Sequence, residues 1–133
     1  MSHYIIAHIG HSTKWSEHIH WWKPESMGYT FCIERAGLYD LKEADAICKS
    51  DLCIAVAKAD AEKIAKGEPF YRRSDGDLAR LYDGHCVAVV PNSSDAWKHL
   101  LHSCIYPGRK KGRPTPIGKK ARAIYLQKEG GAA

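Results

Sequence analysis

The spacing of hydrophobic positions changes several times along this 133-residue chain, and each spacing predicts a different element. A mostly apolar stretch at residues 3–9 predicts a strand. Residues 19–22 and 29–34 are rich in strand formers and flank a turn that contains Pro24 and Gly28. These two segments are therefore predicted to pair as a hairpin with a longer loop.

Helical spacing appears in the middle of the chain. Asp40, with Glu43 three residues later, has the pattern of a capping box and predicts the start of a helix with one apolar face. This helix is expected to end at Asp51. A short buried strand is predicted at residues 52–57, and a second helix at residues 59–66.

Turn signals dominate the next stretch. Strands are predicted at residues 70–73, 78–82 and 85–90, because the Asp-Gly pairs at 75–76 and 83–84 are strong hairpin signals. These three segments are therefore expected to form consecutive strands.

The clearest amphipathic helix follows, with Asn92 and Ser93 as alternative caps. Its apolar stripe consists of Trp97, Leu100, Leu101 and Cys104. Hairpins stand toward both ends of the chain, and short helices stand between them. This order predicts a single α+β domain, with a mostly antiparallel sheet and two or three short helices, and not a doubly wound parallel sheet.

Charge is distributed unevenly along the chain. Residues 1–108 hold 12 Lys/Arg and 14 Asp/Glu, whereas residues 109–133 hold eight Lys/Arg and a single acid, Glu129. A Pro-Gly pair at 107–108 separates the two parts. We therefore predict a compact domain over 1–108 and a basic, flexible tail over 109–133, where a polyanion would bind.

No stretch approaches the roughly 18 apolar residues of a membrane span, and the N-terminus lacks the pattern of a secretion signal. These features predict a cytoplasmic protein. The five cysteines are then expected to stay reduced, and their odd number also argues against a disulfide framework.

Residues 8–11 read His-Ile-Gly-His, which resembles the adenylate-site signature of class I aminoacyl-tRNA synthetases and small nucleotidylyltransferases. In those enzymes the motif joins a strand to a helix in a parallel sheet, and its histidines bind the phosphates of ATP or CTP. Here the predicted hairpin follows too soon for such a helix. The enzymes' lysine motif is also missing, unless Gly118–Lys120 replaces it. A nucleotidyl-transfer enzyme is therefore only an alternative.

The eight histidines also suggest a metal site. His18 and His20 would share one face of a strand, and His11 is close enough in sequence to join them. No C-x-x-C pair accompanies them. We predict no metal, no other cofactor and no catalytic residues, and keep a small metal-dependent enzyme that uses these histidines as an alternative.

Two short patterns resemble small accessory proteins of bacteriophages and prophages. Residues 22–30 fit W-x-P-x-S-x-G-Y-T, and residues 36–44 fit A-G-x-Y-x-x-x-E-A. Their physical content is local, because they specify a turn, a sharp bend at a glycine and a capped helix. The resemblance implies a phage-encoded, non-enzymatic protein that binds a host or defence protein or a nucleoprotein complex, as anti-CRISPR proteins do.

A candidate surface for such a partner contains the aromatic pair Trp21 and Trp22. Neighbouring side chains of a strand point to opposite faces, so one of the two is exposed or covered by another segment. Trp21 is predicted to be the exposed anchor, because Trp22 begins the turn pattern. The alternative is that the second tryptophan packs under residues 14–17 or under a helix on the other face of the sheet. Tyr29, Arg72 and Arg73 complete this candidate surface.

The basic tail provides a second candidate surface. Residues 109–114 resemble the core of an AT-hook, whose extended Gly-Arg-Pro lies in the minor groove of A·T-rich DNA, although Thr115 stands where a second arginine is usual. The alternative function is therefore that of a DNA- or RNA-binding accessory protein, while an acidic protein surface would bind the same charges. The candidate contacts are Arg109, Lys110, Lys111, Arg113, Lys119, Lys120 and Arg122.

Overall fold

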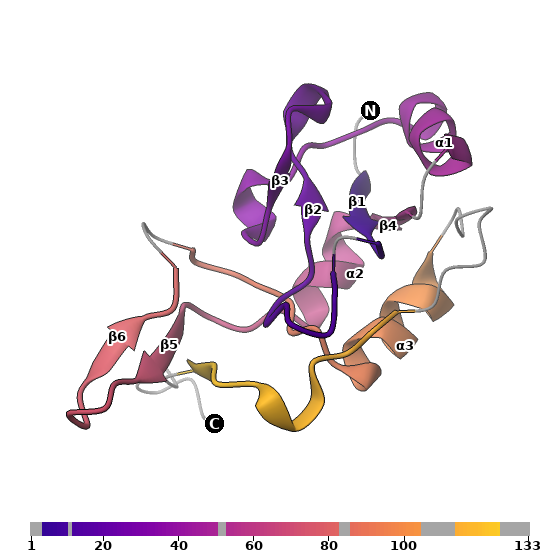
Figure 1. Cartoon of the computed structure of the whole chain (residues 1–133). Coiled ribbons are helices and arrows are strands. Elements are labelled where there is room, and N and C mark those ends of the chain that lie inside the picture. The colour runs from indigo at the N-terminus through magenta and orange to yellow at the C-terminus, as the bar shows by residue number, and fades with distance from the viewer. Residues whose placement is uncertain (1–3, 11, 51–52, 83–85, 105–113, 126–133) are drawn as a thin grey trace.

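The fold combines two antiparallel sheets with three α-helices in the part of the chain that the computed structural model describes, which confirms the α+β prediction. The described residues are 4–10, 12–50, 53–82, 86–104 and 114–125. Figure 1 shows the helices grouped around the larger sheet, while the smaller sheet projects to one side.

The larger sheet has the strand order β3-β2-β1-β4. Its centre is β1 (Tyr4–His8), which pairs along its whole length with β4 (Cys53–Ala57). The predicted hairpin is confirmed, although its strands β2 (Trp21–Trp22) and β3 (Tyr29–Thr30) are shorter than expected. Strands β1 and β4 are almost entirely buried, because helices cover both faces of the sheet.

The two faces of this sheet belong to separate hydrophobic clusters. Side chains alternate along β1, so that Ile5 and Ala7 pack in one cluster and Ile6 in the other. Helix α1 (Leu41–Ser50) covers the side of Ile6. Helices α2 (Lys58–Lys63) and α3 (Ser94–Ser103) cover the opposite side, which holds the larger core.

The hairpin turn contains the short helix η1 (Pro24–Ser26) and is held by the chain that follows η2 (Ile33–Arg35). A Cβ on Gly37 would lie 2.8 Å from backbone atoms of Pro24, so only glycine permits this close approach. Tyr39 then donates its hydroxyl to the carbonyl oxygen of Lys23. The glycine of the A-G-x-Y pattern is therefore required by packing.

Local helix signals in the sequence are confirmed. The Glu43 amide donates to Asp40 Oδ1 over 2.8 Å, and the Asp40 amide donates to Glu43 Oε1 over 3.1 Å, which is a capping box. Ser93 caps α3, since its hydroxyl oxygen accepts a hydrogen bond from the Ala96 amide. No helix among the described residues is long and apolar enough to cross a membrane.

The smaller sheet has the order β6-β5-β7. Strands β5 (Pro69–Arg72) and β6 (Leu78–Arg80) form the predicted hairpin, and Gly76 adopts a φ of +92° in its turn. The prediction of a third strand at residues 85–90 is wrong for residues 86–90, which the structure describes. They run outside this sheet, and β7 (Ile124–Tyr125) pairs with the second edge of β5 instead.

The position of β7 revises the boundary predicted at residue 108. Residues 114–125, together called the C-terminal segment below, contain η3 (Gly118–Lys120) and β7 and pack against the body of the protein. The apolar stripe of α3 ends at residue 104, so local periodicity could not show that a later strand completes the sheet. The other residues of the predicted tail, 109–113 and 126–133, lie outside the described part.

Candidate functional sites

The side chain of Asn92 joins the C-terminal segment to the rest of the protein through hydrogen bonds. Its fully buried side chain donates from Nδ2 to the carbonyl oxygens of Thr13 (2.8 Å), Ser16 (2.9 Å) and Thr115 (3.1 Å). Its Oδ1 accepts a hydrogen bond from Trp97 Nε1 over 2.6 Å. Residues 12–16, called the N-terminal loop below, therefore lie beside the C-terminal segment.

Trp15 lies in the N-terminal loop and is exposed, with 64% of its area accessible to solvent. The ammonium nitrogen of Lys14 lies 5.1 Å from the centre of the indole ring. Lys119 and Arg122 are exposed on the neighbouring C-terminal segment. The two segments also touch directly, because Thr115 Oγ1 donates to the carbonyl oxygen of Ser12 over 3.1 Å. An accessible aromatic ring and several cations thus lie on adjoining segments.

Glu17 follows the N-terminal loop, and groups of the C-terminal segment compensate its negative charge. Its carboxylate accepts hydrogen bonds from the backbone amides of Arg122 and Ala123, at 2.9 to 3.1 Å, and lies 3.7 Å from the Arg122 guanidinium. The side chain is only 10% exposed. The same guanidinium also lies 5.0 Å from the centre of the Tyr71 ring. Glu17 therefore orders the C-terminal segment and contributes little open negative charge.

Only some of the cations predicted to contact nucleic acid lie among the described residues. Lys119 and Arg122 are exposed, and Lys120 lies in η3. Arg109, Lys110, Lys111 and Arg113 lie outside the described residues, as does the AT-hook-like sequence up to residue 113.

A pocket of about 190 Å³ lies between the start of α3 and the C-terminal segment. Its lining includes Ser93 and Ser94 from the helix start, and Ile117 and Ala121 from the segment. Glu17 is also among the lining residues. The described residues that line the pocket include no lysine or arginine, so the pocket itself offers no cation to an anionic ligand.

His18 occupies the junction between the two sheets. It is fully buried, with Nδ1 2.6 Å from the Tyr82 hydroxyl and Nε2 2.5 Å from the Tyr125 hydroxyl. Burial lowers the pKa of His18 to about 4, so the ring is neutral at pH 7. A neutral imidazole donates one hydrogen bond and accepts one, which matches a tyrosine hydroxyl on each side. His18 thus connects an early loop, the end of the β5-β6 hairpin and β7.

The two described histidines of the metal site considered from the sequence, His18 and His20, do not form a metal-binding cluster. Both ring nitrogens of His18 already contact tyrosine hydroxyls, and the ring of His20 packs 4.5 Å from that of Phe31. His11 lies outside the described residues. Within the described part of the chain, the cluster with metal-ligand spacing contains Cys32, Glu34 and Cys86 and no histidine.

His8, the first residue of the His-Ile-Gly-His sequence, ends the central strand β1. His8 is buried and its ring packs against those of Trp22 and Tyr29, at centroid distances of 6.1 and 5.3 Å. A turn, and no helix, follows β1 at residues 9–10. Because β1 pairs with antiparallel neighbours, this sheet differs from the parallel sheet of the HIGH enzymes.

The prediction that Trp21 is the exposed tryptophan of the hairpin is wrong. Trp21 is completely buried in the larger core, whereas Trp22 is half-buried and its ring lies 4.4 Å from that of Tyr29. The pleat separates them as expected, but the face of Trp21 is the one that α2 and α3 cover. Trp21 is therefore unavailable as a partner anchor in this fold, while Tyr29 remains half-buried.

The two arginines of the candidate partner surface lie at the β5-β6 turn. Arg72 is exposed and donates from Nη1 to the Gly76 carbonyl oxygen over 2.7 Å. Arg73 forms an exposed ion pair with Asp75 at 3.1 Å. These contacts are local to the turn. Figure 1 shows the β5-β6 hairpin projecting away from β2, the strand that contains Trp21, so the arginines and Trp21 do not form one surface.

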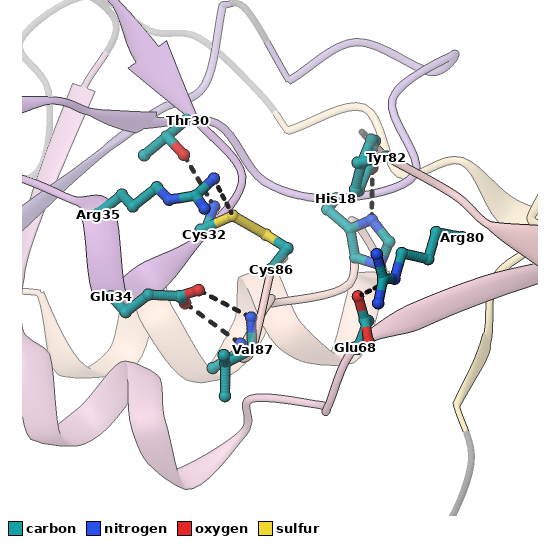
Figure 2. The surroundings of a disulfide bond; sticks show 11 residues. His18, Thr30, Cys32, Glu34, Arg35, Glu68, Arg80, Tyr82, Cys86 and Val87 are labelled. Carbon is teal, nitrogen blue, oxygen red and sulfur yellow. Dashed lines mark hydrogen bonds and ion pairs between the residues drawn. A yellow bond between two sulfur atoms is a disulfide. The ribbon is translucent and has the colours of Figure 1, made fainter. Parts of the chain in front are cut away.

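A disulfide joins Cys32 to Cys86 (Figure 2), so the prediction that all five cysteines stay reduced is wrong. The two residues are 54 positions apart, and no spacing motif signals the pair. Cys48, Cys53 and Cys104 are free thiols, and burial raises the pKa of Cys48 to about 12. Disulfides persist mainly in oxidising compartments, so the cytoplasmic location stays a prediction that the bond does not favour.

Comparison of the chain with family models, with curated proteins and with solved structures finds no match. The resemblance to phage accessory proteins therefore stays a prediction.

Proposed function

We propose that this protein binds nucleic acid, with a preference for single strands, on the surface formed by the N-terminal loop and the C-terminal segment. The observation that carries the proposal is the exposed indole of Trp15, with the ammonium group of Lys14 over its ring. A single exposed apolar side chain is common on proteins. Here, however, the ring lies on a surface whose adjoining segment presents Lys119 and Arg122.

Stacking explains the preference for single strands. Unpaired bases stack on exposed aromatic rings, and nearby cations neutralise the phosphates. In a duplex the base faces are hidden, so Trp15 would lose this contact. The charge of Glu17 is compensated by Arg122 and by backbone amides, so it opposes the polyanion only weakly.

Further positive charge immediately precedes the C-terminal segment in the sequence. Arg109, Lys110, Lys111 and Arg113 precede Pro114, the first described residue of the C-terminal segment. Hydrogen bonds of Thr115 to the side chain of Asn92 and to the backbone of Ser12 hold the start of that segment. This anchoring supports a function in which the basic residues act together with Trp15.

Fluorescence anisotropy with labelled oligonucleotides tests this function. We expect salt-dependent binding of single-stranded DNA or RNA that is tighter than binding of a duplex of the same sequence. Trp15→Ala should weaken single-strand binding by about 5- to 150-fold, the equivalent of ~1–3 kcal/mol for one stacked base. Lys119→Ala should reduce the salt slope for a single strand by about 0.7.

Matched substitutions provide the controls. Lys42 is exposed on α1, on the other side of the larger sheet, and Lys42→Ala should change neither affinity nor salt slope. Met27 is 72% exposed, so Met27→Ala controls for the loss of an exposed apolar side chain. No binding to any nucleic acid, or equal binding by wild type and Trp15→Ala, would reject the proposal. Binding of an acidic polypeptide in place of nucleic acid would point to a protein partner.

Action on a host or defence complex stays a prediction from the resemblance. A nucleic-acid-binding surface is compatible with it, because many such complexes contain guide or target strands. The same anisotropy assay, repeated with a purified nucleoprotein complex, separates the two possibilities.

A further inference from the structure

We propose that Cys32, Cys86 and Glu34 form a binding site for a thiophilic divalent cation, zinc above all, when the disulfide is reduced. One ligand atom of each residue lies within 4.8 Å of the other two. Figure 2 shows the Glu34 carboxylate on the same side of segment 86–88 as the sulfur atoms. Thiolate and carboxylate groups at this separation need only small movements to surround one cation.

Contacts other than the S–S bond hold these ligands together. The Ile33 amide donates to the Ala88 carbonyl oxygen over 2.9 Å, which ties η2 to the segment that carries Cys86. The Glu34 carboxylate accepts hydrogen bonds from the amides of Val87 (2.7 Å) and Ala88 (3.2 Å). Reduction therefore leaves the two segments paired, with the carboxylate already oriented.

The local charges suit a cation bound by thiolates. Arg35 Nη1 lies 3.7 Å from Cys32 Sγ, and a guanidinium at this distance favours the thiolate over the thiol. Two thiolates and one carboxylate carry three negative charges, which a divalent cation and this arginine balance. Each carboxylate oxygen has two lone pairs, so Glu34 can keep its amide hydrogen bonds and still bind the metal.

Burial defines which side of the site is open. Cys32 and Cys86 are 5% and 2% exposed, whereas Glu34 is exposed. A cation held by these three residues has apolar neighbours such as Val89 behind it and solvent in front, so water is its fourth ligand. Three protein ligands and one water form a common zinc arrangement.

Formation of the site requires reduction of the disulfide by a dithiol. The dithiol gives two electrons and two protons to the S–S bond, which breaks into two thiols, and the dithiol itself closes into a disulfide. Binding of the cation then releases the two thiol protons, because both sulfurs bind as thiolates. Either form joins η2 to residues 86–88, covalently in one case and through the cation in the other.

Cadmium titration tests this site, because thiolate-to-cadmium charge transfer gives a distinct ultraviolet absorption. The full-length protein is reduced with a dithiol, freed of excess reductant under anaerobic conditions and titrated with Cd²⁺, and zinc competition follows. We expect one equivalent to bind to the reduced protein with this absorption, and the oxidised protein to show none.

Variants assign the ligands. Cys32→Ser should abolish the stoichiometric absorption, and Glu34→Gln should lower the affinity by at least the roughly 10- to 100-fold that loss of an outer-shell partner costs. Cys104→Ser removes a thiol outside the cluster and should bind like wild type. Circular dichroism confirms that each reduced variant is folded, and Cys86→Ser serves in place of Cys32→Ser if that variant unfolds.

The remaining outcomes reject the site. They are the absence of stoichiometric cadmium binding by the reduced, folded protein, the same affinity in Glu34→Gln as in wild type, and a loss of binding in Cys104→Ser equal to that in Cys32→Ser. Each of these would leave Cys32 and Cys86 as a structural disulfide alone.

Discussion

Asn92 donates a hydrogen bond to the carbonyl oxygen of Thr115, 23 residues later, and thereby makes the C-terminal segment part of the fold. The same side chain contacts the N-terminal loop and Trp97 of α3. One buried amide thus connects the N-terminal loop and the C-terminal segment to the core. This relationship determines what truncation and substitution should do.

Deletion of residues 114–133 should destabilise the protein, although the sequence alone predicts that loss of 109–133 leaves the fold intact. The deletion removes β7 and leaves Asn92, His18 and Glu17 without partners in the C-terminal segment. We expect a loss of about 3 kcal/mol or more in the free energy of unfolding, measured by urea denaturation. Deletion of residues 126–133 alone is the control and should change stability little, whereas equal stability of both truncations would contradict the role of the segment.

Asn92→Ala should be far more harmful than removal of the neighbouring cap. The substitution leaves the buried Trp97 indole N–H and several carbonyl oxygens without their partner, so we expect a cost of about 3 kcal/mol in thermal or urea unfolding. Ser93→Ala removes only the side-chain cap of α3 and should cost about 1 kcal/mol. Similar effects of both variants would show that the Asn92 network adds little stability.

Mild acid should destabilise the protein through His18. Its pKa in the folded chain is about 4, below the ordinary value of 6.5 that it regains on unfolding. Between these values the unfolded chain binds more protons, so stability falls as the pH drops from about 6.5 to about 4. The full contribution is roughly 3 kcal/mol, at ~1.4 kcal/mol per pKa unit.

His18→Gln isolates this effect from the titration of carboxylates. Glutamine can donate to one tyrosine and accept from the other, but it does not titrate. The variant should be less stable than wild type at pH 7, and the difference should shrink toward pH 4. A difference that stays constant over this range in urea denaturation would show that His18 has a normal pKa in the folded protein.

Substitution of Trp21 should destabilise the protein more than substitution of Trp22, although the sequence predicts that Trp21 is the exposed residue of the two. Trp21→Ala removes a fully buried indole from the core and should cost about 3–5 kcal/mol. Trp22→Ala removes a half-buried ring that packs on Tyr29 and should cost less. Thermal melts of the two variants decide the order, and greater damage by Trp22→Ala would contradict the observed packing.

The sequence by itself determined the elements whose signals are local. The capping box at Asp40 and Glu43, a cap at Asn92 or Ser93 and the turn at Gly76 depend on residues a few positions apart. The capping box and the turn occur in the fold, and Ser93 is the residue that caps the helix. Strand β1 and the hairpin after it were likewise predicted from short-range patterns. Together these elements were sufficient for the α+β class.

Only the tertiary structure decided which distant segments meet. Cys32 pairs with a residue 54 positions away, and His18 contacts Tyr125 across 107 positions. Periodicity placed Trp21 and Trp22 on opposite faces of a strand but did not identify the face that the helices cover. The pairing of β7 with β5 depends on an open sheet edge that exists only once the chain has folded. Such contacts arise from the shared burial of remote residues, for which a single sequence carries no local signal.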